Sequence, residues 1–64
     1  MGDNNKLVDL DLTTVDGNAF AIMGAFSRAA TRQGWSKEEV DEVIQEAQSG
    51  DYDNLLAVIM SNCK

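Results

Sequence analysis

Hydrophobic and polar residues alternate over residues 6–14, near the start of the chain. The apolar positions are Val8, Leu10 and Leu12, and the aspartates between them are Asp9 and Asp11. This period of two predicts a half-buried β-strand over Val8–Leu12. The polar residues 1–5 before it are predicted to be disordered, so residues 6–64 would form a single small domain.

Three later segments show the apolar spacing of amphipathic helices. The predicted helices span residues 18–33, 37–49 and 52–62. Asp16 or Asn18 can cap the first helix, and Gly34 is a typical residue just past a helix end. Ser36 and Glu39 have the spacing of a capping box at the start of the second helix. The order of strand, helix, helix and helix predicts an α+β fold that is mostly α.

Two features predict a homo-oligomer. A single strand leaves its N–H and C=O groups without partners, and no second strand pattern is found, so we expect Val8–Leu12 to pair with another subunit. The start of the first helix, Ala19–Phe26, has no polar side chain on any face. A helix that is apolar all round is buried all round, which favours a second contact between subunits there.

The charged residues are unevenly placed along the chain. The 64 residues include 5 Lys and Arg against 11 Asp and Glu, for a net charge of −6. Residues 17–37 contain three basic residues and no acid, whereas residues 38–53 contain seven acids and no base. The net acidity argues against direct nucleic-acid binding, which depends on Lys and Arg. No apolar run is long enough to span a membrane, and a single cysteine fits a reducing cytoplasm.

Catalytic motifs are not found. The chain has no histidine to serve as a base, and Cys63 falls on the apolar stripe of the last predicted helix. Asp9 and Asp11 share one strand face, which is typical of a solvated edge rather than of a hydrolase pair. Asp51 and Asp53 lack the glycine and distal glutamate of a calcium loop and are interpreted as helix caps. We therefore predict a non-enzymatic protein without metal or cofactor.

One group of residues is typical of ligand binding. Its members are Gly17, Asn18, Phe20, Arg28, Arg32 and Trp35. Gly17, Asn18 and the free N–H groups of the helix start can bind a phosphate. Arg28 and Arg32 lie one turn apart and can bind an anion together. The ring of Trp35 or Phe20 can stack on a base. The two regions lie about 24 Å apart along the helix, so another subunit would have to join them. Alternatively, the turn is an ordinary cap and the arginines pair with the acidic second helix.

The segments 17–40 and 49–56 carry a resemblance. The sequence GNAFAIMGAFSRAATRQGWSKEEV, followed by SGDYDNLL, resembles small accessory proteins of tailed bacteriophages that share a DGNAF, MGAF, GW(S/T)KEE and SGDY core over about residues 7–62. The resemblance implies a short phage accessory protein that works by binding, either inhibiting a host or defence factor or sequestering a small signal molecule.

Two functional hypotheses follow. In the first, an anti-defence oligomer sequesters a phosphate-bearing nucleotide signal at its subunit interfaces. In the alternative, the acidic stretch 38–53 inhibits a basic host or defence protein, with electrostatics setting the association rate. A purely structural role is a third possibility.

Overall fold

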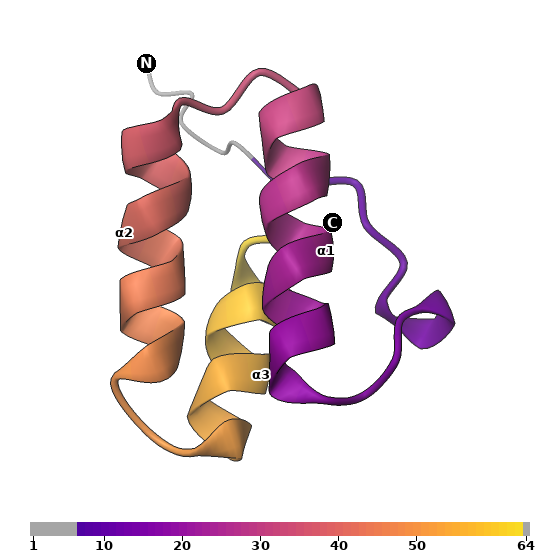
Figure 1. Cartoon of the computed structure of the whole chain (residues 1–64), viewed down its shortest axis with the longest axis vertical. Coiled ribbons are helices and arrows are strands. Elements are labelled where there is room, and N and C mark those ends of the chain that lie inside the picture. The colour runs from indigo at the N-terminus through magenta and orange to yellow at the C-terminus, as the bar shows by residue number, and fades with distance from the viewer. Residues whose placement is uncertain (1–6, 64) are drawn as a thin grey trace.

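The computed structural model describes residues 7–63, and it is mostly helical. After a short 3₁₀ helix, η1 (Leu12–Thr14), come α1 (Ala19–Arg32), α2 (Lys37–Gln48) and α3 (Tyr52–Ser61). Figure 1 shows α1 and α2 running antiparallel, with α3 packed behind them. The three predicted helices are confirmed, each to within one residue at either end. The prediction of disorder over residues 1–5 concerns residues outside the described part of the chain.

Each helix begins at a side chain that caps its free amides. Asn18 accepts the N–H of Ala21 at 2.8 Å, and Asp51 does the same for α3. At α2 the predicted capping box is confirmed: Ser36 Oγ accepts from the Glu39 N–H at 3.1 Å, while Glu39 Oε1 accepts from the Ser36 N–H at 2.8 Å. Such caps contribute about 1 kcal/mol each, a large amount for a chain of this size.

Gly34 ends α1, as predicted. Its φ of +100° is a conformation that glycine adopts without strain. The turn directs the N–H of Trp35 to the carbonyl of Ala30 at 3.0 Å and the N–H of Gly34 to that of Thr31 at 3.1 Å. This pattern of hydrogen bonds is the Schellman motif, which carries the chain after the helix back toward the core.

The predicted N-terminal strand is wrong. No β-strand is found among residues 7–63, and the only β pairing there is an isolated parallel bridge between Val8 and Cys63 of the same chain. The Val8 N–H donates to the carbonyl of Asn62 at 2.8 Å. The side chain of Gln33 accepts a hydrogen bond from the N–H of Asp9 at 2.9 Å and donates one to the carbonyl of Asp9 at 3.1 Å. The segment therefore finds its hydrogen-bond partners on the ends of α1 and α3, and pairing with another subunit is not needed.

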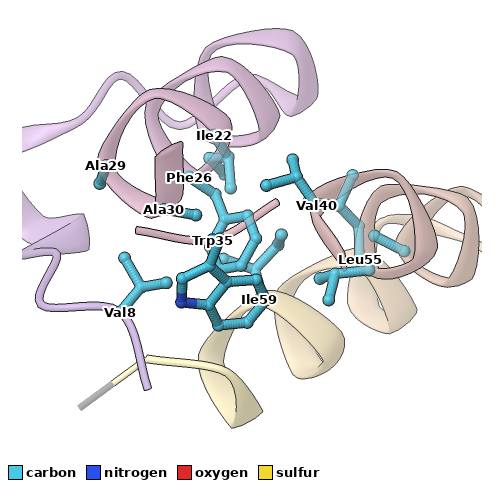
Figure 2. Close-up of a cluster of buried hydrophobic side chains, with 11 residues drawn as sticks. Val8, Ile22, Phe26, Ala29, Ala30, Trp35, Val40, Leu55 and Ile59 are labelled. Carbon is cyan, nitrogen blue, oxygen red and sulfur yellow. The ribbon is translucent and has the colours of Figure 1, made fainter. Parts of the chain in front are cut away.

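One hydrophobic core holds the elements together. Val8, Phe26 and Ile59 are completely buried at its centre, and Figure 2 shows the indole of Trp35 among them. Ile22 also points into this core, whereas Phe20 points outward. The segment Ala19–Phe26 is thus buried on one side only within the chain, and its other side leaves apolar surface exposed.

The connection between α2 and α3 is tight. Asn54 of α3 donates through Nδ2 to the carbonyls of Glu46 and Ala47, at 3.0 and 3.3 Å, and so binds the free end of α2. A β-carbon at Gly50 would lie 2.8 Å from Cβ of Asn54. The close approach explains glycine at this position and fixes the end of α2 against the start of α3.

Candidate functional site

Three of the predicted binding residues, Gly17, Asn18 and Phe20, meet at the start of α1. The side chain of Asn18 already accepts the N–H of Ala21. The carbonyl of Gly17 accepts a hydrogen bond from the hydroxyl of Tyr52, which lies at the start of α3. These polar groups therefore stabilise the fold, as the capped-turn interpretation of this segment expects.

Arg28 and Arg32 lie in the other half of α1. Both side chains are exposed, and neither forms an ion pair with a described residue. Arg32 stands in the last turn, where a positive charge favours the helix dipole. The 14 residues of α1 span about 21 Å, so the structure does not bring the arginines together with Gly17 and Asn18 within one chain.

Trp35 belongs to the core. Its side chain is 9% exposed and meets the ring of Phe26 edge to face, with ring centroids 5.6 Å apart and planes at 85°. Figure 2 shows the indole enclosed by neighbouring apolar side chains. The predicted use of Trp35 as a stacking surface for a base is therefore corrected: an indole packed inside the core has no free face. Of the two aromatic residues proposed for stacking, Phe20 is the exposed one, at 83%.

Phe20 lies at the rim of an open apolar groove. We call the end of the molecule where α1 starts, α2 ends and α3 starts the lower end, which is at the bottom of Figure 1. The groove there has a volume of about 290 Å³. Its walls include Met23 of α1, Gln48 of α2, and Tyr52 and Leu55 of α3. Of the residues that line this groove, the sequence had predicted only Phe20 as a binding residue.

The charges of the described residues are separated along the bundle. Of the basic residues, Arg28 and Arg32 lie in the upper half of α1, and Lys37 starts α2 beside them. The acids of the lower end are Asp16, Glu46, Asp51 and Asp53. Further exposed acids, including Asp41 and Glu42, follow the outer side of α2. The lower end is therefore acidic, and no described base lies there.

A second hollow, of about 390 Å³, lies between the N-terminal segment and the end of α3. It is lined by Asp9, Leu10, Asp11, Leu12, Met60 and Cys63. Burial raises the pKa of the Cys63 thiol, which makes it less reactive at neutral pH. Two hydrogen bonds from Thr13, through its hydroxyl and its N–H, lower the pKa of Asp11. Asp11 caps η1, so this carboxylate already has a structural role.

Sequence reasoning missed Met23, Gln48 and Tyr52 in the lower groove. Tyr52 and Gly17 are 35 residues apart, and no local pattern links them. Tyr52 opens the third predicted helix, and the polar hydroxyl on its apolar ring is the one local signal that it needs a hydrogen-bond partner.

Across residues 7–63, no group of three or more acidic, cysteine or histidine side chains comes together as a metal site. None of the helices in that range has the length and apolar character to cross a membrane. No protein-family model, curated protein or solved structure matches the chain.

Proposed function

We propose that this chain is a non-enzymatic binding module that engages a basic protein through its acidic surface and lower end. One observation carries the proposal. The described bases gather at the upper end, whereas the lower end combines acids with the most exposed large apolar side chain, Phe20. A large apolar side chain left in water is typical of a contact surface when it borders a groove.

The exposed ring of Phe20 and the carboxylates of α2 both favour a partner that combines apolar and basic side chains. Burying the ring of Phe20 against a partner would contribute about 1.5–3 kcal/mol. The carboxylates of α2, from Glu38 to Glu46, would attract positive charge and speed the encounter. Because these carboxylates are exposed, the attraction is screened by salt over about 8 Å at physiological ionic strength.

A basic helical peptide tests the proposal directly. The probe is a peptide of about 15 residues, built from Lys and Ala with one central Leu, and binding is measured by calorimetry at low and at physiological salt. We expect affinity to fall with added salt. Glu42→Lys should weaken binding several-fold, whereas Asp9→Lys, with the same change in net charge at the opposite end of the molecule, should weaken it much less.

Comparing these two variants shows whether the peptide binds a particular surface or is attracted only by the net charge of the chain. Equal losses for Glu42→Lys and Asp9→Lys would mean that only the overall charge of −6 attracts the peptide, and the proposal would fail. Failure of the peptide to bind at low salt would contradict it as well.

The resemblance to phage accessory proteins supplies a setting for this function. In that setting the partner is a host or defence protein in the cytoplasm of the infected cell, and the acidic module inhibits it by covering a basic surface. This setting rests on the resemblance of segments 17–40 and 49–56.

Nucleotide sequestration is kept as a second candidate because of Arg28 and Arg32. Both guanidinium groups are exposed, one turn apart and without an ion pair in the described part of the chain, so they can still clamp a phosphate. Native mass spectrometry with a panel of nucleotide signals tests this role. A bound nucleotide that disappears in the Arg28→Ala, Arg32→Ala double variant would support it, and a chain that ignores every nucleotide would exclude it.

A further inference from the structure

The lower groove has walls that are fixed before any partner binds. The hydroxyl of Tyr52 bonds to the carbonyl of Gly17, which joins the start of α3 to the start of α1. Asn54 joins α3 to the last carbonyls of α2. Asp51 caps α3 through a bond from the Asn54 N–H at 3.0 Å. A preformed groove loses little conformational freedom on binding, which favours affinity.

The groove is apolar inside, with a polar rim. Met23 and Leu55 lie in its wall, Phe20 stands at its edge with 83% of its surface exposed, and Tyr52 is 44% exposed. Gln48 and Asp51 supply polar groups at the border. An apolar centre with a polar rim is the usual anatomy of a protein contact, in which one bulky side chain is inserted and the rim excludes water.

Charge decides which occupant fits. Asp51 is the only charged residue in the groove lining; Asp53 is two residues away in the chain, and Asp16 precedes the start of α1 at the same end. A second copy of this chain would bring its own net charge of −6 against these acids, and like charges placed together oppose association. A segment with lysine or arginine beside its apolar anchor would instead be attracted.

We propose that the groove formed by Phe20, Met23, Gln48, Asp51, Tyr52 and Leu55 receives one leucine or aromatic side chain from a basic helical segment of the partner. This inference rests on the proposed function, since it specifies where and how the basic partner docks. The anchor fills the apolar floor, Phe20 closes over it, and the basic side chains beside it face the acids of the lower end.

Two matched pairs of variants test the groove with the lysine peptide defined above, at physiological salt. Phe20→Ala removes the exposed ring, and Met60→Ala removes another exposed apolar side chain, 59% exposed, on the far hollow. Gln48→Lys puts a positive charge at the groove, and Gln45→Lys puts the same charge on an exposed position of α2 outside the lining. All four side chains are exposed or at the surface, so folding is checked simply by circular dichroism.

We expect Phe20→Ala to weaken binding at least about tenfold, as loss of an aromatic anchor site does, and Met60→Ala to leave it within about twofold. Gln48→Lys should weaken binding more than Gln45→Lys. Replacing the central Leu of the peptide with Ala should reproduce the loss seen with Phe20→Ala, and the two changes together should cost little more than either alone.

The result that overturns the inference differs from the one that overturns the proposed function. If Phe20→Ala and Met60→Ala behave alike while Glu42→Lys still weakens binding, the acidic surface binds the partner and the groove does not. If neither charge nor groove variants change binding, both ideas fail. Concentration-dependent association of the chain alone that Phe20→Ala abolishes would assign the groove to a second copy instead.

Discussion

Two glycines of this chain have opposite surroundings, and they show how much a single β-carbon can change at the scale of a residue. Gly24 lies in the middle of α1, where an added β-carbon would meet nothing within 4 Å. Glycine inside a helix costs about 0.5–1 kcal/mol relative to alanine. We therefore predict that Gly24→Ala raises the free energy of unfolding by that amount in urea titrations.

Gly50→Ala is the control for this prediction, because its β-carbon would lie 2.8 Å from Cβ of Asn54, and we expect it to destabilise the chain. A loss of stability for Gly24→Ala would indicate that another backbone packs against α1 at this position. Such a result would support the subunit contact that the apolar residues of Ala19–Phe26 predicted.

Asp11 gives a pH-dependent prediction. Hydrogen bonds from Thr13 lower the pKa of its carboxyl group in the folded chain. The folded state therefore prefers the carboxylate, so this stabilisation is present above the pKa of the unfolded chain, about 4, and is lost as the pH falls through the lower folded pKa. Asp11→Asn should be less stable than the original chain at pH 7, and the gap should narrow as the pH falls below about 4. A gap of constant size in urea titrations would contradict this.

The two aromatic residues proposed for stacking differ in exposure: Trp35 is buried, and Phe20 is exposed. Trp35 follows Gly34, and the Schellman motif there returns the chain to the core. Phe20 lies two residues after the cap of α1, on the side away from Ile22 and Phe26. Side-chain type predicted both as candidates, but exposure depends on which way a turn and a helix face point, which composition does not determine.

At the scale of elements, the N-terminal segment is the most informative. Its alternating pattern correctly predicted which side chains face inward: Val8 is buried, Leu10 and Leu12 are partly buried, and Asp9 and Asp11 are exposed. The same pattern could not show what its backbone would bond to. The partners are a carbonyl at the end of α3 and the side chain of Gln33, and no period in the sequence marks them.

Gln33 should therefore contribute to stability although it is exposed. Its side chain accepts the N–H of Asp9 and donates to the carbonyl of Asp9. We predict that Gln33→Ala lowers the free energy of unfolding by about 1–2 kcal/mol and speeds hydrogen exchange of the Asp9 amide. Gln45→Ala, at an exposed helical glutamine with no such bonds, is the control. Equal effects of the two substitutions would show that the N-terminal segment is held by its apolar side chains alone.

Helix bounds were the best predicted feature, because their signals are local. Asn18, Ser36 and Gly34 each act within four residues along the chain. The lower groove was not predicted, because it joins the ends of three helices that are far apart in sequence. The charge runs of residues 17–37 and 38–53 were readable from the sequence, and the fold adds that they occupy different parts of the molecule.

For the whole molecule, the fold changes the expected state of association. The N-terminal segment that predicted pairing between subunits finds its backbone partners within one chain, and Val8 is completely buried there. A net charge of −6 adds repulsion between copies. We predict that sedimentation at micromolar concentration gives the mass of one chain, 7.0 kDa. A folded dimer that persists on dilution would contradict this and return the apolar face of α1 to a subunit interface.

A map of amide chemical shifts shows whether the lower end of the bundle is the binding surface. The ¹⁵N-labelled chain is titrated with the lysine peptide at physiological salt. We expect the largest shifts to cluster around the lower groove, at Phe20, Met23 and Gln48, with small changes at Arg28 and Arg32. Shifts centred on the upper end, or spread evenly over the acids, would contradict it.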